Sequence, residues 1–206
     1  MLNIPDVTVV ITNYNYEKYL ARCLRSCLSQ KYVNHEVILV NDASTGSTDC
    51  IKPFMSDIVY IENESNSGVA ASANVGLLNA RGRYVTRVDG DDFISSEMCY
   101  FLMKYLEANH KFFACSCDYI LVDEHEDKLE RISYLEKPIS CAIMYRKDLL
   151  VHYGGYDEAF RHREEEELRK RLGEYYKVGH IAIPFYRYRK HGFNKTLSKE
   201  YLETKI

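Results

Sequence analysis

Residues 84–92, YVTRVDGDD, join a short apolar strand to three carboxylates around one glycine. Neighbouring carboxylates repel one another unless a cation lies between them, so this motif is typical of a metal-diphosphate site. Asp and Gly are also common turn residues after a strand. The motif alone therefore leaves a metal site and a plain turn open, and the rest of the chain has to decide between them.

The composition is that of one globular α/β domain. Of the 206 residues, 46% are hydrophobic and 13% aromatic, which is enough for one well-buried core. A net charge of -3 argues against a nucleic-acid-binding protein, although residues 187–191 (RYRKH) are locally basic. Because neither a membrane-spanning stretch nor a signal peptide is recognised, we expect a cytoplasmic protein. The seven scattered cysteines are expected to be reduced core residues.

Strand and helix patterns alternate in the first half of the chain. Apolar, β-branched runs predict strands at 7–11, 36–40, 58–61 and 84–88, with helices after residue 15, just before Pro53 and at 69–80. Such alternation predicts a parallel sheet with a ligand crevice at the carboxyl ends of its strands. The second half is less regular. We expect it to add an antiparallel or mixed extension with short helices.

Polar clusters directly follow three of the predicted strands. They occupy residues 12–15 (TNYN), 41–44 (NDAS) and 89–92 (DGDD). Because parallel strands end at the same edge of a sheet, the three turns should converge. This convergence favours the metal interpretation of the acidic motif over the plain turn.

These motifs occur in an order that resembles family 2 glycosyltransferases. The similarity includes the segments at 9–15, 40–44 and 89–92, and continues through 154–158 (GGYDE), 164–167 (EEEE) and Tyr188-Arg189-x-His191. It implies a GT-A (Rossmann-like) fold, an α/β arrangement with a mixed, mainly parallel central sheet flanked by helices and a short irregular C-terminal acceptor region. We expect a single domain over residues 1–206, with a nucleotide-binding half at 1–92 and an acceptor-binding half at 93–206.

The resemblance also implies a metal site. Asp91 is the expected ligand of Mn²⁺ or Mg²⁺, hard cations that prefer oxygen and bridge phosphates. Asp89 and His191 are further candidate ligands, and Asp92 either assists or caps the next segment. The basic residues 187–191 are expected either to close as a flap over a diphosphate or to form a solvated basic tail that contacts anionic lipid or the acceptor.

A nucleotide pocket is implied beside the metal. Asp42 is expected to read the base, unless Asp42 and Ser44 only close a turn or cap a helix. Relatives often carry a basic residue at the position of Ala73, so Arg81 or the C-terminal basic cluster is expected to meet the diphosphate charge. The full set of nucleotide-binding candidates is Thr12, Asn13, Tyr14, Asp42, Ser44, Gly68, Asn74, Arg81, Asp89 and Arg189.

The expected general base lies in the acidic run at 164–167. Glu165 stands where the family has an Asp, and Glu164 is the second candidate. Glu is one methylene longer than Asp, and a misplacement of about 1 Å can cost roughly a hundredfold in rate. Alternatively, the four glutamates only stabilise a helix N-terminus and face water. Residues 154–160 are expected to form the acceptor-side loop.

The expected function is inverting, metal-assisted sugar transfer from a nucleotide-diphosphate sugar, with a UDP-sugar favoured, to a hydroxyl of a glycan or lipid-linked acceptor in surface polysaccharide biosynthesis. One alternative is a catalytically weak homologue that binds nucleotide sugars or pairs with an active partner. Another is a nucleotidyltransferase, which should show a Gly-rich basic signature where this chain has TNYN at 12–15. Peripheral contact with the inner face of the membrane and a homodimer are left open.

Overall fold

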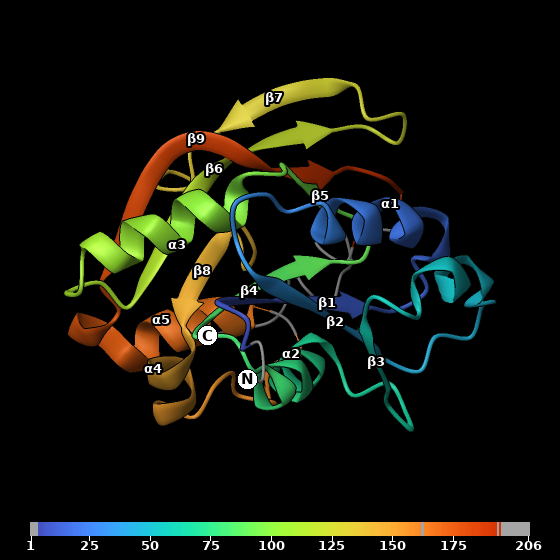
Figure 1. Ribbon diagram of the computed structural model, residues 1–206, viewed down its shortest axis with the longest axis horizontal. Helices are drawn as coiled ribbons and strands as arrows, with labels where there is room; N and C mark the ends of the chain where they lie inside the picture. The colour runs from blue at the N-terminus through green and yellow to red at the C-terminus, as the bar shows by residue number, and fades with distance from the viewer. Residues whose placement is uncertain (1–3, 162, 193, 195–206) are drawn as a thin grey trace.

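The computed structural model describes residues 4–161, 163–192 and 194, and these form one nine-stranded mixed sheet flanked by helices (Figure 1). The strand order is β3-β2-β1-β4-β8-β6-β9-β5, and β7 pairs with β6 beside this path. The first four strands are parallel: β1 (Val7–Asn13), β2 (His35–Asn41), β3 (Val59–Glu62) and β4 (Tyr84–Asp89). The parallel sheet expected from the alternating pattern is therefore present.

The second half extends the same sheet with antiparallel and parallel pairs. Its strands are β5 (Phe93–Ile94), β6 (Ala114–Val122), β7 (Lys128–Ile132), β8 (Ile143–Arg146) and β9 (Val178–Arg189). Strand β8 runs antiparallel to both β4 and β6, and β9 runs parallel to β6. This is the mixed extension that the sequence predicted, and it joins the two halves through the β4–β8 pair.

Helices cover both faces of the sheet. They are α1 (Glu17–Leu28), α2 (Val69–Asn79), α3 (Met98–Ala108), α4 (Lys147–His152) and α5 (Glu164–Leu172), with 3₁₀ helices η1 (Asp49–Phe54) and η2 (Gly173–Tyr175). In Figure 1, α1 and α3 lie on one side of β1 and β2, while α2 and α4 lie on the other. Among the described residues, no helix has the length and apolarity needed to cross a membrane.

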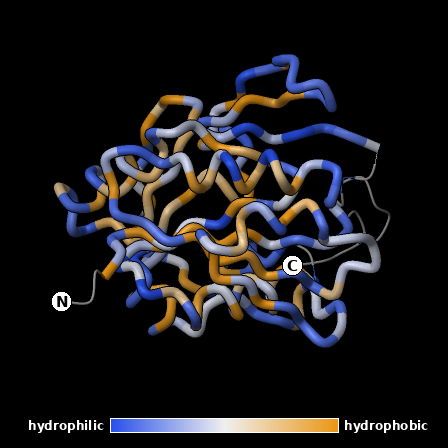
Figure 2. Tube along the Cα trace, turned by 45° about the vertical axis from the view of Figure 1, so that its right-hand side comes forward, coloured by the Kyte–Doolittle hydropathy of each residue, from blue (hydrophilic) through white to orange (hydrophobic). Residues whose placement is uncertain are grey.

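The burial of β1 explains why its sequence lacks alternation. All seven of its residues are buried, which is typical of a parallel strand covered on both faces. Figure 2 shows the apolar segments gathered in the interior and hydrophilic segments along the periphery. All seven cysteines are free, and only Cys50 is not fully buried. They are thus core residues, as expected.

Two local expectations are corrected. The first short helix, η1, includes Pro53 and does not end before it. The basic residues at 187–189 do not form a flap, because they belong to β9, where Arg187 pairs with Ile120 and Arg189 pairs with Val122 of β6. The sheet pairing of these residues fixes their backbone in an extended conformation.

Candidate active site

A cavity of about 400 Å³ lies at the carboxyl ends of the first strands and is lined from both halves of the chain. From the first half it receives the polar residues Thr12, Asn13, Tyr14, Asp42, Asp89, Asp91 and Asp92. From the second half it receives the N-terminal glutamates of α5, Tyr188, Lys190, Asn194 and the loop at 137–141. The three polar turns that follow β1, β2 and β4 therefore meet at one site.

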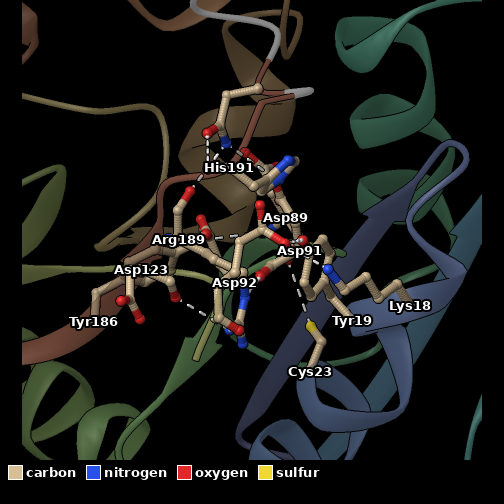
Figure 3. A network of polar contacts seen from close by, with 12 residues as sticks. Lys18, Tyr19, Cys23, Asp89, Asp91, Asp92, Asp123, Tyr186, Arg189 and His191 are labelled. Carbon is tan, nitrogen blue, oxygen red and sulfur yellow. Dashed lines mark hydrogen bonds and ion pairs between the residues drawn. The ribbon is translucent and has the colours of Figure 1, made fainter. Parts of the chain in front are cut away.

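The three aspartates of the acidic motif have different partners (Figure 3). Asp91 Oδ2 lies 2.9 Å from His191 Nε2 and accepts a 3.3 Å hydrogen bond from Asn194 Nδ2. Asp92 accepts hydrogen bonds from Tyr186 Oη at 2.7 Å and from the Arg189 backbone N–H at 2.8 Å. Asp92 thus anchors the loop to β9, and Asp91 is paired with His191, whose side chain is buried beneath the residues that line the cavity.

Burial perturbs the titration of these carboxyls. It raises the pKa of Asp91, and the hydrogen bond with His191 only partly offsets this rise. Burial raises the pKa of Asp92 well above its ordinary range, and the neighbouring Asp91 and Asp89 raise it further. A site that crowds carboxylates in this way favours a bound cation.

The donor atoms at Asp91 and His191 fit a divalent cation. Two neighbouring ligands of an octahedral Mg²⁺ lie about 3 Å apart, because each bond is about 2.1 Å long. The 2.9 Å between Asp91 Oδ2 and His191 Nε2 is the distance of a hydrogen bond between these two side chains, and it is also compatible with this spacing. Within the described part of the chain, no group of three or more His, Cys, Asp or Glu side chains is arranged to hold a metal. Phosphate and water oxygens would complete the coordination, as is usual for Mg²⁺.

On the nucleotide side, Asp42 is buried and orders the loop that leads into α2. Its carboxylate accepts hydrogen bonds from Asn63 Nδ2 at 2.8 Å, and from the backbone N–H groups of Ser67 and Gly68 at 2.9 Å each. Gly68 has φ of 91°, a conformation that favours glycine. Asp42 therefore holds the loop directly before α2, and base recognition by the same residue stays a prediction.

Asn13 is the second buried polar residue on this side. Its Nδ2 donates to Asn41 Oδ1 at 3.0 Å and to Ser44 Oγ at 3.1 Å. Its Oδ1 is buried without a hydrogen-bond partner and would lie 2.7 Å from a Cβ added at Gly90. Ser44 therefore acts by holding Asn13, while Asn13 itself lines the cavity.

Five of the ten predicted nucleotide contacts do not line the cavity: Ser44, Gly68, Asn74, Arg81 and Arg189. Arg81 pairs with Glu36 at 2.7 Å, close to the start of β4 and away from the cavity. Asn74 uses its amide to hold Tyr156 and Glu158, through bonds of 2.8 to 2.9 Å. These two residues are structural, and the expectation that they meet the nucleotide is corrected.

Arg189 is also corrected. Its side chain is 2% exposed and is fully engaged behind the acidic motif (Figure 3). Nε donates to the Asp91 carbonyl at 2.8 Å, and Nη2 contacts Glu126 at 3.1 Å. The basic residue of this segment that lines the cavity is instead Lys190. Arg189 is the last residue of β9, and Lys190 follows the end of the strand.

The acidic helix brings its first residues to the cavity. Glu164, Glu165 and Glu166 all line it, and the first two are buried at 2% exposure. Glu165 Oε1 accepts hydrogen bonds from Arg169 at 2.6 Å and from Tyr176 Oη at 2.7 Å. The expectation that the run simply faces water is therefore wrong for Glu164 and Glu165, and the role of either as a base stays a prediction.

Sequence comparison identifies the family of this chain. A family model described as Glycosyl transferase family 2 matches residues 8–197. The chain belongs to glycosyl transferase family 2. This membership removes the nucleotidyltransferase alternative.

Curated relatives of this family 2 domain match over part of their length. Glycosyltransferase GlyA of Streptococcus pneumoniae is 44% identical over 101 residues, which are 47% of this chain and 14% of the relative. The putative colanic acid biosynthesis glycosyl transferase WcaA of Escherichia coli is 27% identical over 157 residues, 73% of this chain and 56% of the relative. The family 2 domain thus spans only part of the length of these proteins.

Solved structures confirm the expected GT-A fold. TarS 1-349 of S. aureus in complex with UDP-GlcNAc has a TM-score of 0.79 at 19% identity, over 98% of this chain and 62% of TarS. The mannosyltransferase PcManGT of Pyrobaculum calidifontis, in complex with GDP-Man and Mn²⁺, has a TM-score of 0.69 at 18% identity, over 91% of this chain and 57% of that one. At this identity the likeness concerns the fold.

Sequence reasoning missed several cavity residues of the family 2 domain. Residues 154–160 were expected as the acceptor-side loop, but the loop at 137–141 lines the cavity instead. No motif marked that loop. Arg87 also lines the cavity and is 5% exposed. A signal for Arg87 was present, because an arginine inside an otherwise apolar buried strand is rare unless it is paired.

Proposed function

We propose that this domain transfers a sugar from a nucleotide-diphosphate sugar to an acceptor hydroxyl, with metal assistance and inversion at the anomeric carbon. The observation that carries the proposal is that Asp89 and Asp91 share one cavity with the glutamates of α5. Sugar transfer needs both groups together, since charge on the leaving diphosphate must be neutralised while a base activates the attacking hydroxyl.

Each part of the cavity has its own proposed role. Asn13 and Asp42 bind the nucleoside at the ends of β1 and β2, and Asp91 with His191 would hold a divalent cation. Such a cation, when bound, neutralises charge on the leaving diphosphate. Glu165, with Glu164 as second candidate, takes the proton of the acceptor hydroxyl. Attack from the side of α5, opposite the leaving group, gives inversion.

The comparisons support a nucleotide-sugar donor and a surface-glycan product. TarS is described with UDP-GlcNAc and PcManGT with GDP-Man and Mn²⁺, so a UDP-sugar or GDP-sugar is the proposed donor class, with UDP-sugar first. The name of the relative WcaA refers to colanic acid biosynthesis, which supports polysaccharide biosynthesis as the setting. Peripheral contact with the inner membrane surface is proposed because lipid-linked acceptors lie there.

The donor site can be tested by thermal shift with UDP, GDP, CDP and dTDP, each with and without Mn²⁺. A ligand at about 100 times its dissociation constant stabilises a protein by about 2.7 kcal/mol, so one nucleotide should raise Tm by several degrees and more so with Mn²⁺. Asp91→Asn should abolish the Mn²⁺-dependent part. Arg81→Met is the matched control and should keep the shift, because Arg81 lies away from the cavity. A chain that responds to no nucleotide contradicts the proposal.

A second candidate function is nucleotide-sugar binding with only slow transfer. The contacts of Glu165 favour it, because Oε1 is already engaged by Arg169 and Tyr176 and a base must reach the acceptor within hydrogen-bond distance. Donor-sugar hydrolysis separates the two functions. Metal-dependent nucleotide binding without measurable hydrolysis or transfer would select this second function.

A further inference from the structure

Arg87 links the donor carboxylates to the acidic helix. Its Nε lies 3.3 Å from Asp89 Oδ1, and its Nη1 donates a 2.7 Å hydrogen bond to Glu164 Oε1. Arg87 lies in β4 beside Val10 of β1, whereas Glu164 is the first residue of α5. One guanidinium on β4 therefore reaches a glutamate 77 positions along the chain from Arg87, and all three residues line the same cavity.

The strand geometry explains the contact on the donor side. Residues two apart in a strand point to the same face, so Arg87 stands beside Asp89 on β4. Asp89 Oδ1 also accepts a 3.1 Å hydrogen bond from Thr12 Oγ1. Asp89 is thus oriented by a hydrogen bond from β1 and by an ion-pair contact with Arg87, whose Nε is buried and makes no hydrogen bond.

The ion pair between Arg87 and Glu164 of α5 is buried, and its burial restricts where α5 can lie. The side chains of Arg87 and Glu164 are 5% and 3% exposed. A buried charge is costly unless it is paired, so α5 is held where Glu164 meets the guanidinium. A buried ion pair is weak evidence for stability alone. Arg87 contacts one carboxylate on each side of the proposed reaction, Asp89 and Glu164. This indicates that Arg87 helps to position the two sides relative to each other.

We propose that Arg87 is a positioning residue that sets Asp89 and the N-terminus of α5 relative to each other, and so aligns the donor with the base in the proposed sugar transfer. The inference rests on the proposed function. Arg87 acts through Asp89 and Glu164. Its forked guanidinium suits this task, because five N–H donors in a fixed plane can hold two carboxylates at once, whereas a lysine ammonium is a point charge on a flexible stem.

The test compares Arg87→Lys and Arg87→Met with the wild-type chain. UDP affinity with Mn²⁺ is measured by calorimetry, and donor-sugar hydrolysis is expressed per UDP-binding site. Arg87→Lys keeps the charge but loses the fork, so we expect UDP affinity within threefold of wild type and hydrolysis lower by about a hundredfold, the effect of a misplacement of about 1 Å. Arg87→Met should lose more activity than Arg87→Lys.

The matched control is Arg83→Lys. Arg83 directly precedes β4 and pairs with Glu107, but its side chain is 59% exposed and lies outside the cavity. The Arg83→Lys variant should keep the wild-type hydrolysis rate and UDP affinity. Melting curves of every variant show whether the fold is kept.

The outcomes separate this inference from the proposed function. Hydrolysis by Arg87→Lys within threefold of wild type overturns the positioning role, and so does a loss of UDP affinity equal to the loss of rate. An Arg87→Lys chain without a cooperative melting transition would make Arg87 a folding residue and also overturn it. If the wild-type chain itself neither binds a nucleotide nor hydrolyses a donor, the proposed function fails and the role of Arg87 fails with it.

Discussion

Asp91 and Asp92 are neighbours in the chain, but their surroundings give them different tasks. Asp91 is paired with His191, whereas Asp92 is bound by Tyr186 and the Arg189 backbone. The carboxylate of Asp92 thereby ties the acidic loop at 89–92 to β9. Residue type alone could not distinguish the two, because the difference comes from partners about 100 positions away.

At the same scale, Glu36 gives a testable pH dependence. Burial raises the pKa of Glu36. The Arg81 backbone N–H, the Thr8 hydroxyl and the Arg81 guanidinium together lower it by more, so the net pKa is below the ordinary 4.5. A lowered pKa in the folded state stabilises the fold above pH 4.5, and this contribution disappears as pH falls through the folded pKa. Glu36→Gln should therefore lower the free energy of unfolding by about 1–3 kcal/mol at pH 7.

Urea unfolding at pH 7 and pH 4 measures the effect of Glu36→Gln. The difference from wild type should be smaller at pH 4, because the Glu36 carboxylate of the unfolded chain, with its ordinary pKa of 4.5, is largely protonated there. Glu64→Gln is the control, since Glu64 is exposed and its replacement should leave stability unchanged at both pH values. A difference that stays constant between the two pH values would contradict the assignment.

The predicted contacts of Arg81 and Arg189 were wrong, because residue type does not reveal the partner of a charged side chain. Both were assigned to the diphosphate because the family's basic residue is replaced by Ala73, and both are instead bound by acidic or carbonyl groups of the protein. A positive charge in a sequence does not reveal which anion it meets. The family resemblance implied that Asp91 and His191 lie together, and the two side chains are 2.9 Å apart.

Among the elements, α5 carries the proposed general base. Glu165→Gln keeps the size of the side chain and one acceptor for Tyr176 Oη, but it cannot take a proton. We therefore expect a loss of about 10²–10⁴-fold in turnover, the usual contribution of a general base, with UDP affinity unchanged. Donor-sugar hydrolysis and transfer to an acceptor measure the rate, and calorimetry measures UDP binding.

The control for α5 is Glu174→Gln, because Glu174 lies in η2 directly after the helix and is exposed. It should keep full turnover. Wild-type turnover in Glu165→Gln would exclude Glu165 as the base and leave Glu164 as the candidate. The Glu164→Gln variant, measured in the same assay, then decides whether α5 carries the base at all.

Elements of the first half were predictable for a physical reason. Each parallel strand is a continuous apolar run followed by a polar turn, so its end and its direction can be seen locally. In the second half, β8 lies between β4 and β6, and β9 returns beside β6. Such pairings depend on long-range partners, so the sequence indicated a mixed extension without its order, and residues 187–189 of β9 were expected to belong to a flap or a solvated tail.

At the scale of the whole molecule, the β4–β8 pair decides whether the halves 1–92 and 93–206 are independent. The pair carries Thr86, whose buried Oγ1 donates a 2.8 Å hydrogen bond to the Ile143 carbonyl across the seam. Strand β4 without β8 would expose an unpaired edge in the middle of the sheet. We therefore expect the two halves to unfold together in one transition.

Thr86→Val tests this cooperativity, because the loss of one buried hydrogen bond should cost about 1 kcal/mol at the seam. Far-UV circular dichroism and tyrosine fluorescence follow unfolding in urea, since the chain has 18 tyrosines and no tryptophan. In a single unit both probes must shift to lower urea by the same amount, as a two-state transition requires. Two separate transitions, or a shift in only one probe, would show that the nucleotide half and the acceptor half fold separately, and Arg87 would then connect two domains.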